Sequence, residues 1–567
     1  MKKKGISILL ACVLALSTAA CGSSDTAGGQ QENSSSVQEA VSEAVSEAES
    51  SGEMTDGKFN ETRTITVEVY DRGNDGGSDP TNNNWTNYIK EGMLEEYNVQ
   101  VEFVSVSRWT EVEEINNLLA AGDAPDICVT YDYSTIKTYA DMGGVVDLSS
   151  ALEEYKDMLP NLWDWLGETY LYWDQDPETG SLWAIEGRMA ASNNLNTFIR
   201  KDWLDTLGLE APETTQEFYE MLCAFRDNAE VLLGDDAANI IPFFLSEDVG
   251  WYARPLIMSF IDPDITDYDY YVHGFDDRFF TMDGTKEAIR LLNQWYNEDL
   301  IWKDFVLVDA ETGEDYIKSG YVGAFCQNWD TPYRNGDDSY QRNLERIVGE
   351  DAEFIAVNCF EDKNGNYSYY SGGEIDRKVF FPTTNTEILA SLLYLDWITD
   401  PEHVEYLQIG EEGITHNLLE SGAVETITAT GDWIQNSGYN IDYTLTVNGL
   451  KLVDEEQTAL STAYSYGGGD PEQVEQANQN SLLYPARVVG PVNVGTIQAE
   501  SGVGTALNEK RTMVFDQAVV ASVEDFDSVW DAGMADYMSS GGQAIQDERA
   551  EKWAQYYGDA VMLADVE

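Results

Sequence analysis

The sequence predicts an α/β protein with a parallel or mixed sheet that carries helices on its faces. The first observation is the alternating stretch 64–70, which is typical of a strand. The second is the order strand, helix, strand, helix, strand, expected at residues 64–70, 85–97, 99–106, 112–121 and 126–130. The third is a later series of amphipathic helices, expected at residues 215–226, 286–297, 387–398 and 403–408. An Asn-Gly pair within 361–366 predicts a hairpin turn.

The first residues of the chain predict an export signal. Three lysines precede an apolar run at 6–20, and the small residues Ala19 and Ala20 stand just before Cys21. The run is shorter than the roughly 20 residues that a membrane-spanning helix needs. Residues 18–21 are similar to a bacterial lipobox, with Thr18 where a large aliphatic residue is usual. We therefore predict a signal peptide at 1–20 and lipidation of Cys21, and the alternative is an ordinary signal peptide cut nearby.

Residues 21–61 predict a disordered linker behind the lipid anchor. The segment is rich in Ser, Glu, Gln and Gly, and Phe59 is its one aromatic residue. Such a composition buries too little apolar surface to offset the entropy of ordering the chain. We expect this linker to space the folded body, from residue 62 onward, away from the membrane.

The net charge of −71 limits the possible ligands. Affinity for nucleic acid depends on Lys and Arg neutralising phosphates, so nucleic acid is excluded as a partner. An anionic ligand would need a local basic pocket, whereas a neutral ligand would not. The charge therefore favours sugars over phosphates, nucleotides and polyanionic saccharides.

Cysteine and histidine spacing gives no reason to expect a metal or another cofactor. Cys128, Cys223, Cys326 and Cys359 form no C-x-x-C pair, which argues against a zinc site and favours buried thiols, with a disulfide as the open alternative. Apolar residues interrupt the oxygen-bearing residues of 227–236, so that segment does not match a calcium loop.

Four stretches of the chain carry a resemblance to a known family. They are 118–127 (Leu-Leu-Ala-Ala-Gly-Asp-Ala-Pro-Asp-Ile), 198–214, 317–325, and 394–398 with 410–414. These stretches resemble the extracellular solute-binding proteins of carbohydrate ABC importers, particularly the long lipoprotein branch of Gram-positive bacteria. The resemblance extends from about residue 62 to residue 419 and is most specific in 198–214.

The resemblance implies a two-lobe periplasmic-binding-protein-like fold with hinge strands and an interlobe cleft. Lobe one is expected to contain residues 62–188 and 362–425, and lobe two residues 189–361 and 426–567. Together with the charge, the family implies a neutral oligosaccharide ligand and ABC permease subunits as partners. It also implies a monomer, without cofactor, held by its lipid anchor at the extracellular face of the membrane.

Candidate ligand contacts follow from where the strands end and from sugar chemistry. Ligands of open α/β sheets bind beyond the carboxyl ends of strands, and Trp and Tyr offer flat apolar faces to sugar rings. The candidates are Asn84 and Trp85 after the first strand, Tyr131, Asp132 and Tyr133 after the strand at 126–130, Glu186 and Arg188 at the first crossover, Trp251 and Tyr252 after a polar loop, and Trp329 and Asp330 after the strand at 321–325.

Each of these candidates has a structural alternative. Trp85 can equally be the first core residue of its helix, and Glu186 with Arg188 can equally form a hinge ion pair. Helical spacing predicts core positions for Trp203, Trp295 and Trp397, while the sequence favours neither role for Trp163, Trp165 and Trp173.

Nothing in the sequence supports catalysis. The three histidines, His273, His403 and His416, form no metal-spaced pair, and the nucleophile elbow, the Walker loop and the dinucleotide fingerprint are all missing. The leading hypothesis is therefore a lipid-anchored receptor, not an enzyme, that binds an oligosaccharide by domain closure and delivers it to a permease. The alternatives are a receptor for a peptide or other non-sugar solute, a surface glycoside-degrading enzyme and a passive adhesin.

Overall fold

The computed structural model describes residues 54–73, 77–191, 193–276, 278–308, 310–371, 373–488 and 492–565. The predicted signal peptide, the lipidation site Cys21 and residues 21–53 of the predicted linker lie outside these ranges. Among the helices that are described, none has both the length and the apolar character needed to cross a membrane.

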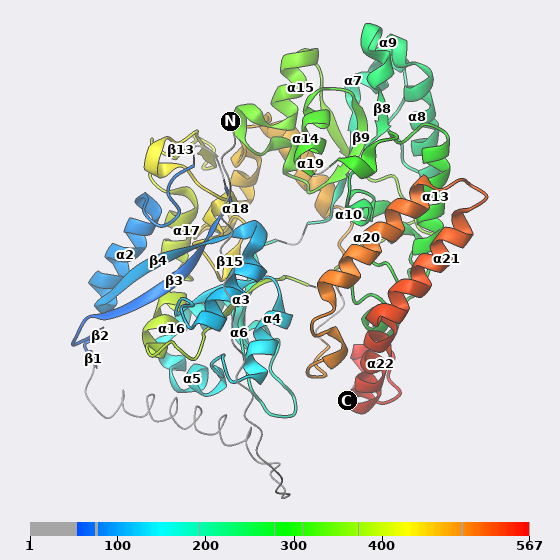
Figure 1. Cartoon of the computed structure of the whole chain (residues 1–567). Coiled ribbons are helices and arrows are strands. Elements are labelled where there is room, and N and C mark those ends of the chain that lie inside the picture. Colours follow the sequence, from blue (N-terminus) through cyan, green and yellow to red (C-terminus); the bar gives the residue numbers. More distant parts are fainter. Residues whose placement is uncertain are drawn as a thin grey trace, which may run out of the picture.

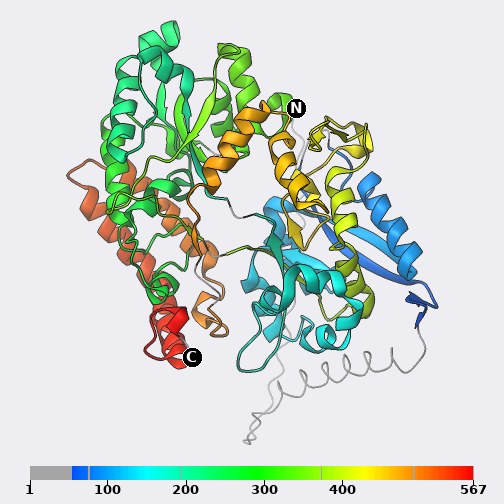
Figure 2. The same ribbon diagram turned by 180° about the vertical axis from the view of Figure 1, so that it is seen from behind.

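Two lobes, each with its own hydrophobic core, make up the described chain (Figure 1). One core gathers residues from Phe59 to Ile185 and from Val379 to Leu445. The other gathers residues from Phe198 to Tyr370 and from Val474 to Ile545. Seen from behind, only narrow segments join the two bodies (Figure 2). The predicted two-lobe α/β fold is confirmed.

Lobe one is built on a mixed sheet. Its strands are β3 (Arg63–Asp71), β4 (Val99–Ser107), β5 (Cys128–Thr130), β6 (Ile185–Met189), β12 (Ile375–Phe380) and β15 (Val447–Asn448). Strands β3 and β4 pair in parallel, and a parallel bridge between Val67 and Ile127 joins β3 to β5. The other four strands lie in the order β15-β6-β12-β5. The strands β3 and β4 run toward the second lobe (Figure 1), so their carboxyl ends face the interlobe region.

Four helices of lobe one agree with the predictions to within about two residues: α2 (Asn84–Tyr97), α3 (Glu111–Ala121), α16 (Ile388–Trp397) and α17 (Pro401–Ile409). The lobe also contains helices that the sequence did not predict: α4 (Tyr133–Asp141), α5 (Ser149–Glu154), α6 (Pro160–Leu171) and α18 (Glu455–Ser461). Local chemistry sets their ends. Asn83 forms a capping box with Thr86 at the start of α2, and Gly122 ends α3 in the left-handed conformation at φ 74°.

Lobe two has a four-stranded sheet surrounded by helices. Its strands lie in the order β10 (Phe354–Val357), β7 (Asn196–Arg200), β9 (Val322–Gln327) and β8 (Ile241–Phe243). Its helices are α7 (Lys201–Leu207), α8 (Thr215–Asp227), α9 (Ala229–Leu233), α10 (Val249–Tyr252), α11 (Arg254–Phe260), α12 (Asp267–His273), α13 (Thr285–Asn297), α14 (Ala310–Lys318), α15 (Tyr340–Val348) and α19 (Pro471–Leu482). The C-terminal helices α20 (Gly504–Val520), α21 (Phe526–Tyr537) and α22 (Gln543–Tyr557) flank this lobe in orange and red (Figure 1).

The chain passes between the lobes later than the sequence predicted. Tyr370 packs in the lobe-two core and β11 (Tyr370–Ser371) pairs with β16 (Arg487–Val488), so the return to lobe one lies just before β12 and not at 362. Likewise, β15 pairs in parallel with β6, which keeps lobe one together well beyond residue 425. The last passage lies between Asn448 and Tyr466, because Tyr466 packs against the lobe-two core.

Two further expectations need correction. Residues 54–61 are not part of a disordered linker: β1 (Met54–Thr55) pairs with β2 (Lys58–Phe59), and Phe59 is buried in the lobe-one core. The turn at 361–366 is present, with the Asp362 amide donating to the Asn366 carbonyl, but it joins no hairpin. Its flanking strands, β10 and β11, pair elsewhere, with β7 and β16. Two short strands of lobe one, β13 (His416–Leu418) and β14 (Val424–Thr426), form a hairpin of their own.

Trp85 has no solvent exposure and packs edge-on against Trp433, so its role is structural. We expect Trp85→Ala to lower the free energy of unfolding by about 3–5 kcal/mol, because a large buried side chain leaves a cavity. Chemical denaturation measures this loss. The control Trp85→Phe keeps most of the packed volume and should lose clearly less, and a Trp85→Ala protein as stable as the parent would contradict the assignment.

The free energy of unfolding should depend on pH through Asp516, which lies on the face of α20 that packs on α10. Burial, with added repulsion from Glu247 and Asp248, raises its pKa to about 7. The pKa of Asp in the unfolded chain is about 3.9. Between that pH and about pH 7, native Asp516 therefore keeps a proton that the unfolded chain has lost. Stability contributed by this group therefore falls as the pH rises through that window. We expect Asp516→Asn to be more stable than the parent at pH 8, with the difference shrinking toward pH 4.

A matched control for Asp516 is Asp527, whose pKa is lowered to about 2 by hydrogen bonds from Arg290 and Lys286. Asp527→Asn should destabilise the protein at pH 7, which is the opposite sign. Urea denaturation at pH 8 measures the change in the free energy of unfolding for both variants. Equal changes for Asp516→Asn and Asp527→Asn would contradict the raised pKa of Asp516.

Candidate ligand site between the lobes

Aromatic and basic side chains gather where the first three strands of lobe one end. The Tyr131 ring, just after β5, stacks on Tyr70 with centroids 6.3 Å apart. The Arg108 guanidinium, just after β4, lies 4.3 Å from the Tyr131 centroid. Next to it, Trp109 is 72% exposed, and its indole N–H donates to the Arg72 carbonyl at 3.2 Å. Tyr131 thus lies, at the carboxyl ends of these strands, in a surface that includes an exposed indole, and its contact with a ligand stays a prediction.

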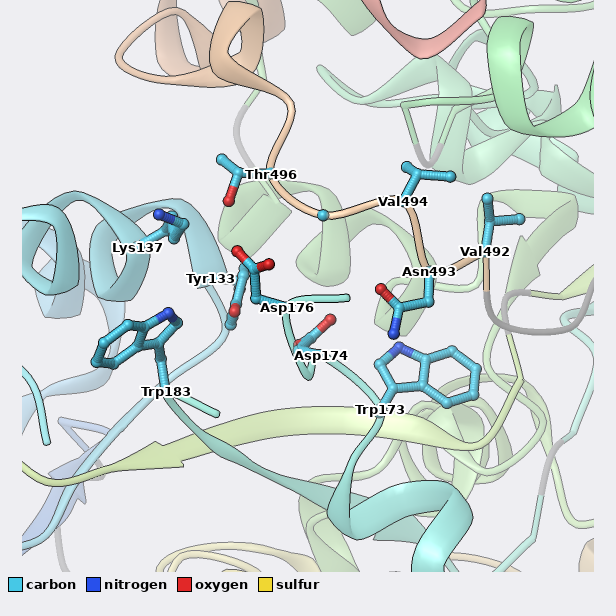
Figure 3. Close-up of a pocket in the computed structure, with 11 residues that line it drawn as sticks. Tyr133, Lys137, Trp173, Asp174, Asp176, Trp183, Val492, Asn493, Val494 and Thr496 are labelled. Atoms are coloured by element: carbon cyan, nitrogen blue, oxygen red, sulfur yellow. The ribbon is translucent and has the colours of Figure 1, made fainter. Parts of the chain in front are cut away.

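Tyr133 opens α4 and lines a pocket between the lobes (Figure 3). The lobe-one wall of the pocket consists of Tyr133, Lys137, Trp173, Asp174, Asp176 and Trp183, and the facing wall is the segment 492–496 of the C-terminal region. Figure 3 shows the two indoles on opposite sides of the two carboxylates, with the 492–496 segment passing over them. Flat apolar faces, carboxylates and an amide therefore converge on one cavity.

Direct contacts hold the two walls of this pocket together. The Asn493 side-chain amide donates to the Gln175 carbonyl at 2.8 Å, and the Tyr556 hydroxyl donates to a Glu178 carboxylate oxygen at 2.8 Å. Both acceptors lie in the loop after α6, whereas both donors come from the C-terminal quarter of the chain. The pocket is thus enclosed by segments that approach each other only when the lobes are close.

The pocket has a negative electrostatic character. Burial raises the pKa of the Tyr133 phenol, and the charges of Asp174, Glu186 and Asp176 raise it further. Lys137 forms an ion pair with Asp141 one turn along α4. The one cation in the pocket wall is therefore already paired with a carboxylate.

Glu186 lies beside the pocket and not in it. It is 1% exposed, and Lys378 of the neighbouring strand β12 lies 3.5 Å away. Burial is the main reason why its pKa is raised well above the usual range, with Asp174 contributing. Glu186 was predicted either to contact the ligand or to form a structural ion pair. Its burial favours the ion pair, because a wholly buried carboxyl does not reach a ligand in this conformation.

Arg188 forms an ion pair at the hinge, but its partner is Glu374 and not Glu186. Its Nε donates to Glu374 at 2.6 Å, which joins the end of β6 to the start of β12, where the chain changes lobes. The guanidinium lies 4.7 Å from the Trp165 centroid and 4.8 Å from that of Tyr170. Trp173, of the pocket wall, stacks on Tyr170 at 6.0 Å. A continuous stack therefore links the hinge to the pocket.

In lobe two, Trp251 and Trp329 remain partly exposed near the end of β9. The Trp251 indole donates to the side-chain oxygen of Gln327 at 3.0 Å, and Arg278 lies 5.1 Å from its ring. Asp248, the N-cap of α10, accepts from Arg278 and fixes its position. Trp329 meets Tyr466 edge-on at 5.7 Å. Both indoles are thus partly exposed on lobe two.

Five of the predicted ligand contacts lie outside the pocket or are engaged in other interactions. Trp85 is a core residue, and Asn84, half-buried at the start of α2, does not line the pocket. Tyr252 is 7% exposed and packs edge-on against Phe244, and burial raises its pKa to about 12. Asp330 is buried and accepts from Arg334 and from the Tyr466 hydroxyl at 2.6 Å. Asp132 caps α4 by accepting from the Ser134 amide.

Sequence reasoning missed most of the pocket wall. The sequence favours no role for Trp173, and it assigns no function to Asp174, Asp176, Trp183 or the segment 492–496. Their only sequence signal is a polar loop, 172–183, with an indole at each end and carboxylates between them. Within the described residues, no group of three His, Cys, Asp or Glu is arranged to hold a metal ion.

Comparison with known proteins agrees with this architecture. The family described as bacterial extracellular solute-binding protein matches residues 76–311. The polygalacturonan/rhamnogalacturonan-binding protein YtcQ of Bacillus subtilis is 21% identical over 81% of this chain and 86% of its own length. The fructooligosaccharide ABC transporter substrate-binding protein FusA of Streptococcus pneumoniae is 27% identical over 42% of this chain and 47% of its own.

Solved structures show the same fold. The alginate-binding protein AlgQ2 superposes with a TM-score of 0.61 at 15% identity, over 88% of this chain and all of that one. FusA in complex with kestose gives 0.60 at 15% identity, with the same coverage. In its two lobes, the pocket between them and these matches, the chain is similar to the bacterial extracellular solute-binding proteins and shares their fold.

Proposed function

We propose that this protein is the receptor of a carbohydrate ABC importer, which captures an oligosaccharide between its lobes and delivers it to the permease. The observation that carries the proposal is the interlobe pocket, where Trp173 and Trp183 flank Asp174 and Asp176. Sugar rings have apolar C–H faces and hydroxyl edges, so indoles receive the faces and carboxylates accept from the edges. The saccharide ligands named for YtcQ and FusA support the same ligand class.

Capture is coupled to lobe closure in this proposal. Asn493 and Tyr556 reach the loop after α6 only when the lobes approach, and the pocket wall that they complete then covers the ligand. A ligand that touches both walls favours the closed state by its extra contacts there. The narrow passages before β12 and before Tyr466 supply the hinge.

The site is proposed to extend from the pocket across both lobes. Tyr131, Asp132 and Tyr133 are consecutive, so they join the pocket to the aromatic surface at the carboxyl ends of β3 and β4. Trp251 and Trp329 form the lobe-two side. Attachment through a lipidated Cys21, an extracellular position and a monomeric state complete the proposal. They rest on the lipobox and on similarity to the lipoprotein LipO of Bacillus subtilis, which is 25% identical over 58% of this chain.

Calorimetric titration with neutral fructo-, malto-, manno-, xylo- and galacto-oligosaccharides tests this function. We expect saturable binding of at least one of them, with no product formed. We expect the double substitution Trp173→Ala and Trp183→Ala to weaken that binding at least tenfold, because stacking area is lost, while unfolding stays cooperative. Trp433→Ala, which removes a half-buried indole beside Trp85, serves as the control and should keep the affinity. Turnover of a sugar would instead indicate a glycosidase.

The lobe-two surface makes a separate prediction. Replacing both Trp251 and Trp329 with Ala should abolish detectable binding, since the partner lobe loses both partly exposed indoles, while thermal stability changes little. Trp302→Ala is the matched control, because that indole donates to the Leu245 carbonyl within lobe two. Full affinity in the double variant would remove Trp251 and Trp329 from the site.

A further inference from the structure

The charges around the pocket carry information about which sugars it accepts. Neither Asp174 nor Asp176 forms an ion pair with any described residue. The Asp176 carboxylate accepts from the amides of Glu178 and Thr179, at 2.8 and 3.1 Å, so its oxygen is held in place by the loop backbone. Two carboxylates therefore face the cavity without a neutralising cation.

None of the described residues that line the pocket supplies an unpaired cation. The facing wall is Val492-Asn493-Val494-Gly495-Thr496, which is neutral. Lys137 is paired with Asp141, and Lys378 with the buried Glu186. The arginines of the wider site also have carboxylate partners: Arg108 pairs with Glu111, Arg188 with Glu374 and Arg278 with Asp248. Every cation named here thus already has a carboxylate partner.

A uronate needs what this pocket lacks. Carboxylate recognition in proteins uses Arg or Lys, with bidentate arginine as the strong case. A carboxylate placed between Asp174 and Asp176 would instead meet two like charges in a partly enclosed space, where screening is weaker than in water. Neutral hydroxyls, in contrast, donate to both carboxylates, and an ammonium group would gain from their charge.

We propose that Asp174 and Asp176 make this pocket a subsite for an uncharged or ammonium-bearing sugar residue and exclude uronates from it. This inference rests on the proposed function, since it concerns the same ligand site. It separates the chain from YtcQ, whose name gives polygalacturonan, a polymer of uronate, as a ligand.

Paired ligands test the selectivity. The probes are whichever neutral oligosaccharide binds in the titration with neutral sugars, together with the same oligosaccharide oxidised at C6 to uronates. For a xylo-oligosaccharide, whose residues have no C6, the charged probe is the same chain with a glucuronate substituent. We expect the neutral form to bind the parent protein at least tenfold tighter at 20 mM salt, equivalent to about 1.4 kcal/mol, with a smaller ratio at 0.5 M salt. Partly de-N-acetylated chito-oligosaccharides should bind at least as tightly as their acetylated forms if chito-oligosaccharides are accepted.

The variant Asp174→Asn with Asp176→Asn identifies the residues responsible. Asparagine keeps an acceptor for the Glu178 and Thr179 amides, so the loop should hold its shape. We expect the neutral-to-uronate ratio to fall to within threefold, through gained affinity for the uronate. The control Asp235→Asn with Asp236→Asn removes the same charge from exposed positions in lobe two and should leave the ratio unchanged.

Three results would overturn the inference. One is equal binding of neutral and oxidised ligands by the parent protein. Another is a neutral-to-uronate affinity ratio that does not change in the variant with Asp174→Asn and Asp176→Asn. The third is a control variant, Asp235→Asn with Asp236→Asn, that changes this ratio as much as the pocket variant does. In each of these cases sugar capture itself stands, because a sugar still binds. Failure of every saccharide to bind the parent would overturn both the proposed function and the selectivity.

Discussion

The placement of β12 between β5 and β6 is the constraint on which the rest of the site depends. This strand returns from lobe two and pairs on both sides, so Thr130, Lys378 and Glu186 come into one row across the sheet. Tyr131 to Tyr133 follow directly from that row. The same pairing brings Glu374 beside Arg188, which ties the end of one interlobe passage to the start of another. The pairing of β12 with β5 and β6 therefore positions both the candidate site residues after Thr130 and the hinge contact between Arg188 and Glu374.

The local elements could be predicted from sequence because their signals are local. Alternation predicted β3 and β4. Gly122 ends α3 in the left-handed backbone conformation that glycine adopts easily, and the Asn83 side chain caps the start of α2. The lobe limits depend instead on pairings between distant strands. The contact of β15 with β6 joins residues some 260 positions apart, and no short-range pattern near residue 447 announces it.

The site could be predicted only in part, for the same reason. Tyr131 and Tyr133 follow a strand end, where the topology rule applies. Tyr252, however, is one helical position beyond Trp251, a rotation of about 100°, which turns its ring into the core. Asp330 is likewise adjacent to a partly exposed indole but is occupied by Arg334 and Tyr466. Trp173 and Trp183 lie in a loop without periodicity, so only the tertiary structure shows that they share a cavity.

The two walls of the pocket come from remote parts of the gene product. Trp183 belongs to the loop that follows α6, whereas Val492 and its neighbours belong to the segment that leads into α20. Mutations that alter one wall leave the packing of the other lobe untouched, since the cores are separate. Substitutions can therefore reshape one wall of the pocket while the other wall and the core behind it keep their packing.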